Sequence, residues 1–197
     1  AGIQTLVERR IGDDHKRRLA CGIVIACVPA ALAGLLLEDV VQTEFRSPAL
    51  VAVTLVVSGL ALQAADRLAS RRKEVEALTL ADALVIGLAQ AVALVPGVSR
   101  SGATITAALA LGASRDAAAR FSFLLSAPIV FGAGLLEVGE MARVGIDLPF
   151  LVGVATSALV GYLAIRYLLV YVRTRSYSVF VWYRIAVGFA VLGLLAR

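Results

Sequence analysis

The sequence is poor in charged residues, in aromatic residues and in cysteine, and each scarcity narrows what it can encode. Only 17% of its 197 residues are charged and 7% are aromatic, whereas a soluble domain is ordinarily about a quarter charged. An ordinary soluble domain is therefore excluded. The two cysteines, Cys21 and Cys27, lie six positions apart in one apolar run. They would point in different directions on a helix, so they make a poor disulfide or metal pair and are expected to pack.

Apolar residues are abundant instead, and they occur in long runs. They make up 60% of the chain, and the mean hydropathy is +0.89. Uncharged apolar stretches of about 18 residues or more are typical of membrane spans. We expect five such spans, the third slightly short and the last two with one internal arginine each: 19–37, 48–65, 121–136, 148–171 and 179–196. The predicted fold is all-α, a polytopic integral membrane protein with residues 1–197 as one transmembrane domain.

The positive charge of the chain is concentrated between these runs. The formal net charge is +5 and the sequence pI is about 9.7, which could suggest nucleic acid. The cations form no aromatic-bearing patch, so nucleic acid is excluded as a partner. The basic connections are 1–18, 66–79, 114–120 and 172–178. They all fall on one face, the cytoplasmic one, if 80–113 enters the bilayer and returns on the same side.

Residues 80–113 are predicted to form this re-entrant hairpin. As helices, 80–95 and 103–113 would extend ~24 Å and ~16 Å, short of the ~30 Å hydrocarbon core. Between them stands PGVSRSG, residues 96–102. Its proline and glycine end the first helix. Polar backbone at this depth is tolerated only inside protein or beside a water-filled cavity.

The composition of this loop indicates an oxyanion site, and phosphate is the oxyanion that we expect there. A loop leading into a helix presents unpaired N–H groups and the positive end of the helix dipole. Arg100 adds a bidentate cation, and an intramembrane arginine is a functional-site candidate. The alternatives are that the small residues serve helix packing and that Arg100 pairs with a buried carboxylate. The predicted catalytic residues are Arg100, Ser99 and Ser101, and the predicted phosphate-binding residues are Gly97, Gly102 and Thr104.

The pattern P-G-x-S-R-S-G-x-T resembles the second signature of the undecaprenyl-diphosphate phosphatase (bacitracin-resistance, BacA/UppP) family. The downstream FSFLL-x-x-P, from Phe121 to Pro128, and the upstream CVPAALAGLLLEDVV resemble the family as well. The resemblance covers the chain from about Leu19 onward. It implies a membrane hydrolase that removes one phosphate from undecaprenyl diphosphate and so recycles the carrier lipid of peptidoglycan synthesis.

The resemblance implies further properties. Family members have six spans and two re-entrant hairpins in an inverted repeat, so we expect here the second half of such a fold. A divalent metal, Mg²⁺ or Ca²⁺, is expected as cofactor, with ligands outside this chain. The expected partners are the lipid diphosphate, the bilayer and a second copy in a homodimer. The expected location is the bacterial inner (plasma) membrane.

The sequence departs from the family pattern near its start. A first, Glu-rich signature ending in Ser-Ser-Thr-x-His is expected ahead of the first span, and residues 1–197 contain no match to it. The one histidine, His15, does not fit and is expected to be solvated. We therefore expect a fragment that lacks the N-terminal part and turns over little alone. The alternatives are a transporter or flippase for a phosphate-bearing lipid, or an inactive fragment.

Overall fold

The computed structural model describes residues 15–37, 47–144 and 147–196, without the side chains of 136, 137 and 140–144. Among the described residues the regular secondary structure is all helical, with one isolated bridge between Lys73 and Ala113, which confirms the predicted all-α class. The helices are α2 (His15–Leu36), α4 (Pro48–Leu68), the short 3₁₀ helix η1 (Val75–Ala77), α5 (Leu80–Val92), α6 (Arg100–Ala110), α7 (Arg115–Val144), α8 (Leu148–Thr174) and α9 (Ser178–Leu195).

Five of these helices, α2, α4, α7, α8 and α9, are long and apolar enough to cross a membrane. The five predicted spans are thus confirmed. The third was expected at 121–136 and is longer, because α7 begins at Arg115. Ser114 caps this start: its Oγ accepts from the N–H of Ala117 at 3.1 Å. The polar first turn therefore continues the apolar run as one helix.

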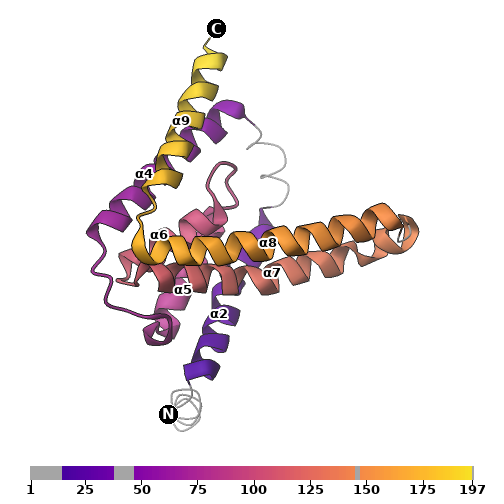
Figure 1. The fold of residues 1–197 in the computed structure, drawn as a ribbon, viewed down its shortest axis with the longest axis horizontal. Helices are drawn as coiled ribbons and strands as arrows, with labels where there is room; N and C mark the ends of the chain where they lie inside the picture. Colours follow the sequence, from indigo (N-terminus) through magenta and orange to yellow (C-terminus); the bar gives the residue numbers. More distant parts are fainter. Residues whose placement is uncertain (1–14, 38–46, 145–146, 197) are drawn as a thin grey trace.

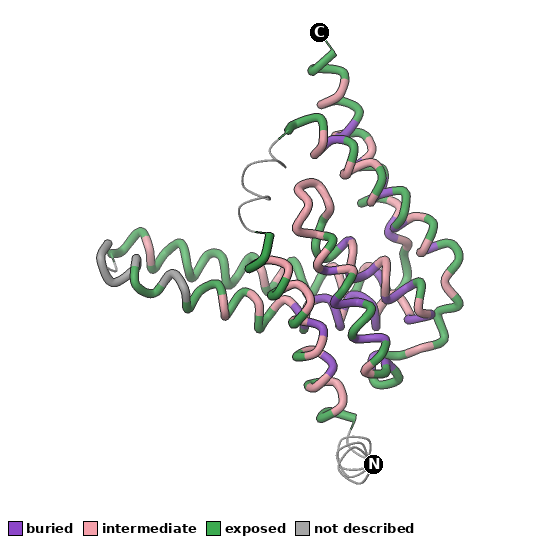
Figure 2. The backbone as a smooth tube through the Cα atoms, turned by 180° about the vertical axis from the view of Figure 1, so that it is seen from behind, coloured by how far each residue is buried: buried purple, intermediate pink, exposed green. Residues whose placement is uncertain are grey.

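Four of the five spans form two pairs that point in different directions, and α2 projects separately (Figure 1). The helices α7 and α8 form a long hairpin, while α4 and α9 lie side by side and diverge from it. The short helix α6 packs against α4, α5 and α7, and α5 packs between α6 and α2. The described residues in the far part of the α7–α8 hairpin are exposed (Figure 2), and many of them are large and apolar. Such a surface suits contact with lipid chains.

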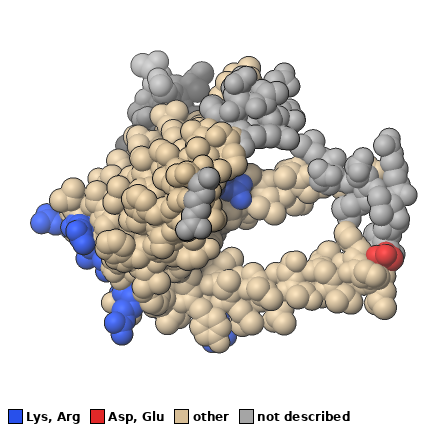
Figure 3. All heavy atoms as spheres, turned by 90° about the horizontal axis from the view of Figure 1, so that it is seen from above, with Lys and Arg blue, Asp and Glu red and all other residues tan. Residues whose placement is uncertain are grey.

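The charged side chains are also distributed unevenly over the molecule. On the face shown in Figure 3, Lys and Arg side chains lie mainly over the compact part of the molecule, and few charged side chains lie on the described part of the projecting hairpin. The compact part contains the described residues of the connections 66–79, 114–120 and 172–178. Residues 1–14 of the first basic connection lie outside the described residues.

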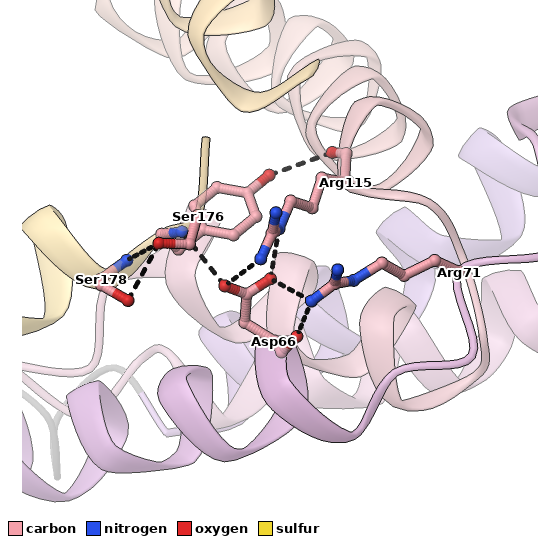
Figure 4. A network of polar contacts seen from close by, with 6 residues as sticks. Asp66, Arg71, Arg115, Ser176 and Ser178 are labelled. Carbon is pink, nitrogen blue, oxygen red and sulfur yellow. Dashed lines mark hydrogen bonds and ion pairs between the residues drawn. The ribbon is translucent and has the colours of Figure 1, made fainter. Parts of the chain in front are cut away.

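A buried carboxylate joins three of these connections (Figure 4). Asp66 is 1% exposed. Its carboxylate accepts two hydrogen bonds from Arg115, at 2.6 Å and 2.9 Å, and one from the backbone N–H of Tyr177 at 3.2 Å. It also forms an ion pair with Arg71. Burial, together with the charge of Asp66, raises the pKa of the Tyr177 phenol. Tyr177 therefore stays protonated and donates to the carbonyl of Arg115 at 3.0 Å.

The connections 66–79, 114–120 and 172–178 are called the base from here on. The segment 80–113 begins and ends at this base. The N–H of Lys73 donates to the carbonyl of Gly112 at 3.0 Å, and the N–H of Ser114 donates to the carbonyl of Lys73 at 2.8 Å. The chain thus leaves the base as α5 and comes back to it at the end of α6. This path is the one that re-entry requires. The depth that the hairpin reaches in a bilayer stays a prediction.

Candidate anion-binding site

The segment that carries the site is a helix, a seven-residue break and a second helix. A capping box starts α5: the Thr79 hydroxyl accepts from the N–H of Asp82, and the Asp82 carboxylate accepts from the N–H of Thr79. Lys73 pairs with Asp82 at 3.0 Å. The helix was expected to run to residue 95 but ends at Val92. Residues 93–98 continue as tight turns, because Pro96 has no N–H to extend the helix.

Helix α4 supports the loop from one side. The Thr54 hydroxyl donates to the carbonyl of Pro96 at 2.6 Å. The next residue, Gly97, has φ +88°, a conformation that glycine adopts without strain. A Cβ at Gly97 would also collide with the Thr54 hydroxyl and the Val51 carbonyl. Gly97 is therefore required here for both its backbone angle and its lack of a side chain.

The loop leads into the N-terminus of α6, where donors gather. Ser99 is the N-cap, and its Oγ accepts from the N–H of Gly102 at 3.1 Å. The Ser99 and Ser101 hydroxyl oxygens are 3.2 Å apart, and both side chains are exposed. The N–H groups of Arg100 and Ser101 have no partner among the described residues. An anion would be stabilised there by these donors and by the helix dipole.

Arg100 faces one of two cavities beside this helix start. The cavity, of ≈540 Å³, lies between α2, the end of α5 and α7. The Arg100 guanidinium makes no hydrogen bond or ion pair with the described residues, so within them the alternative of a carboxylate partner is not realised. Gln90 lines the same cavity, and its buried Nε2 has no partner in the described part. The remaining lining is apolar, from small and aliphatic side chains.

Thr104 is placed differently from the other predicted phosphate contacts. It is 2% exposed, and its hydroxyl lies 2.8 Å from that of Ser122 on α7. It also donates to the carbonyls of Arg100 and Ser101. Thr104 therefore connects α6 to α7 through a hydrogen bond with Ser122. Its contact with phosphate stays a prediction.

The structure adds a residue that the loop motif does not contain. Arg184 of α9 is 7% exposed, and its Nη2 donates to the Gly97 carbonyl at 3.0 Å and to the Ser58 hydroxyl at 2.5 Å. In the sequence this residue is the internal arginine of the last apolar run, and the sequence pattern assigns no functional role to it. Two signals could have indicated otherwise: an arginine within an apolar span, and Thr54 and Ser58 at i, i+4 spacing on one face of another span.

The chemistry of the assembled site is that of anion binding. Among the described residues, no Asp or Glu lines the two cavities that flank the start of α6. The described residues also contain no group of three His, Cys, Asp or Glu that could hold a metal ion. The described residues therefore do not fit a divalent cation. What they offer is guanidinium, hydroxyl and backbone donors, the groups that bind phosphate oxygens.

Comparison with known proteins gives a family match and relatives whose names agree with that family. The sequence matches the family described as "Bacitracin resistance protein BacA" over residues 1–190. It is 48% identical to an undecaprenyl-diphosphatase of Pelotomaculum thermopropionicum over 188 residues, covering 95% of this chain and 71% of the relative. It is 52% identical to an undecaprenyl-diphosphatase of Geobacter sulfurreducens over 183 residues, covering 90% of this chain and 68% of the relative.

Proposed function

The chain belongs to the bacitracin resistance protein BacA family, and we propose that it is an undecaprenyl-diphosphatase that hydrolyses the lipid diphosphate to undecaprenyl phosphate and inorganic phosphate. Water adds to the terminal phosphorus, the bridging P–O bond breaks, and undecaprenyl phosphate leaves. Relatives that carry this activity in their names are about half identical to the chain over most of its length. The product is the carrier lipid used again in peptidoglycan synthesis.

The observation that carries the proposal is the unpaired guanidinium of Arg100 at the N-terminus of α6. A cation without a carboxylate partner in a largely apolar cavity favours an anionic ligand. In the proposed reaction Arg100 binds the diphosphate and stabilises the charge that develops in the transition state. Ser99 and Ser101 orient the phosphoryl oxygens, and the free N–H groups of the first turn add further donors.

The lining of the Arg100 cavity supports a substrate with a long apolar chain. Its walls on α2 and α7 consist of small and aliphatic residues, namely Ala30, Ala31, Gly34, Leu35, Pro128, Ile129, Gly132 and Ala133. A polyprenyl chain can lie along such a surface while its diphosphate meets Arg100 at the polar end. We therefore propose that the polyprenyl chain of the substrate lies against α2 and α7.

Location and cofactor extend this proposal. The five candidate spans and the family make the chain a multi-pass membrane protein, and we place it in the bacterial inner (plasma) membrane as a homodimer. A divalent metal, Mg²⁺ or Ca²⁺, is proposed as cofactor from the family resemblance, with ligands outside the described residues. Chelation with EDTA should abolish phosphate release, and adding back one of these ions should restore it.

The test of the function is phosphate release by the protein purified in detergent. Undecaprenyl diphosphate should yield one inorganic phosphate and undecaprenyl phosphate, whereas undecaprenyl phosphate offered as substrate should yield none. Transport of the lipid between the leaflets of a vesicle without any phosphate release would contradict hydrolysis and support a carrier instead.

A further inference from the structure

A second cavity lies on the other side of the α6 start from Arg100. It has a volume of ≈330 Å³ and is enclosed by α4, α6, α8 and α9. Most of its wall is apolar or aromatic, including Leu55, Leu168, Phe180 and Tyr183. Its polar lining includes Ser99, Ser101 and Arg184. The serines of the loop and Arg100 thus line different cavities that share one helix N-terminus.

Arg184 brings a buried positive charge to this cavity. Its Nη2 makes both of its hydrogen bonds, to neutral oxygen atoms of Ser58 and Gly97. Neither Nη1 nor Nε has a partner among the described residues. Nη1 lies beside Gly102, because a Cβ built there would be 2.7 Å from it. One edge of the guanidinium therefore fixes the loop, while Nη1 at the α6 start is left for a ligand.

No described carboxylate neutralises this charge. The aspartates with buried or half-buried side chains are engaged at the base: Asp66 with Arg115, Asp82 with Lys73, and Asp116 with Arg120 and Arg173. No Asp or Glu of the described residues lines the cavity. A buried cation without a counter-ion is unfavourable, and in a membrane protein it commonly marks a site for an anion.

We propose that this cavity is a second anion-binding site, in which Arg184, Ser99 and Ser101 bind a tetrahedral phosphate group. The phosphate supplies the missing negative charge and accepts hydrogen bonds from Nη1 of Arg184 and from the two hydroxyls. The inference rests on the proposed function for the source of the phosphate. That source is either one phosphate of the lipid diphosphate, whose other phosphate meets Arg100, or the inorganic phosphate released by hydrolysis.

Binding is tested first, without turnover, with inorganic phosphate as the probe. The thermal unfolding midpoint of the protein in detergent is measured against phosphate concentration at constant ionic strength. A ligand that binds the folded state raises this midpoint in a saturable way. The half-saturating concentration should rise about tenfold or more in Arg184→Gln, as expected for the loss of a charge-assisted hydrogen bond.

The matched control is Arg166→Gln, which removes the same charge from an exposed position on α8 that lines neither cavity. It should keep the phosphate dependence of the unmodified protein. If Arg184→Gln does not fold, Ser101→Ala replaces it, since that exposed side chain can be removed without disturbing the Arg184 contacts. It should also weaken phosphate binding. Equal phosphate dependence in the unmodified protein and in the folded site variant would overturn the proposal.

Steady-state kinetics then separate the two sources. The constants of Arg184→Gln are compared with those of the unmodified protein. A rise of about tenfold in the phosphate inhibition constant with KM unchanged assigns the site to the released phosphate, whereas a rise in KM assigns it to the lipid headgroup. If neither constant changes while hydrolysis persists, the second site is wrong and the proposed function stands. If the protein hydrolyses no lipid diphosphate but loses phosphate binding on replacement of Arg184, the function is wrong and the site stands.

Discussion

Gly102 and Arg184 are 82 positions apart in the chain, yet they are in such close contact that no side chain fits between them. A Cβ at Gly102 would lie 2.7 Å from Nη1 of Arg184 and 3.1 Å from the Cβ of Ser99. The first turn of α6 therefore lies directly against the guanidinium of α9. The position of the donors at this helix start depends on that contact.

Replacing Gly102 by alanine should impair the site while the fold is kept. The added methyl group forces the guanidinium or the Ser99 cap to move, and displacements of about 1 Å can cost up to about a hundredfold in rate. We expect kcat/KM to fall by at least about tenfold with a modest change in the unfolding midpoint. Gly161→Ala on α8, where a Cβ would meet no atom within 4 Å, is the control and should leave both unchanged. Full activity in Gly102→Ala would show that this close contact is dispensable.

Gly97 and Gly112 allow backbone strain to be separated from site geometry. Both have φ +88°, so alanine at either position should destabilise the protein by roughly 1 kcal/mol or more. Gly97→Ala should also reduce activity in the fraction that remains folded, because it moves the loop off Thr54 and Arg184. Gly112→Ala, at the base, should reduce stability alone. The measurements are the unfolding midpoint and kcat per folded molecule, and equal specific activity in the two variants would contradict this assignment.

Replacing Arg100 should reduce turnover by orders of magnitude without loss of stability. The side chain is exposed in the structure and has no partner in the described part, so folding does not depend on it. Arg100→Ala removes the charge and Arg100→Lys removes the bidentate geometry, so both should be poor enzymes. Phosphate release from the lipid diphosphate is the measurement, with Arg166→Ala as control. Near-normal turnover in Arg100→Ala would exclude Arg100 from the catalytic site.

Replacing Asp66, unlike replacing Arg100, should lower the stability of the protein. Asparagine at this position leaves Arg115 near a neutral amide in a buried setting, and breaking a buried ion pair in this way costs about 3–5 kcal/mol. We expect a large fall in the unfolding midpoint in detergent. Asp147→Asn removes an exposed carboxylate that caps α8 and should cost about 1 kcal/mol or less. Similar midpoints for the two variants would show that the base network contributes little.

The spans and the interrupted helix could be read from the sequence because both follow from local properties. An apolar run long enough to cross a bilayer forms a helix whose backbone hydrogen bonds are all internal, and a proline followed by a glycine, as at Pro96 and Gly97, favours the end of a helix. The first helical turn of α7 was missed because its residues are polar. They are helical because Arg115 and Asp116 are neutralised by partners at the base.

The sequence by itself determined the five spans, the break at PGVSRSG and the kind of ligand that its donors favour, since these depend on contiguous residues. The tertiary structure decided how those donors are divided. Arg100 faces a cavity next to α2 and α7, while Ser101 and the non-helical N-cap residue Ser99 face one next to α4 and α9. Only the packing of α4 and α9 brings Thr54, Ser58 and Arg184 to the loop, because contacts between residues 42 and 87 positions apart leave no local pattern.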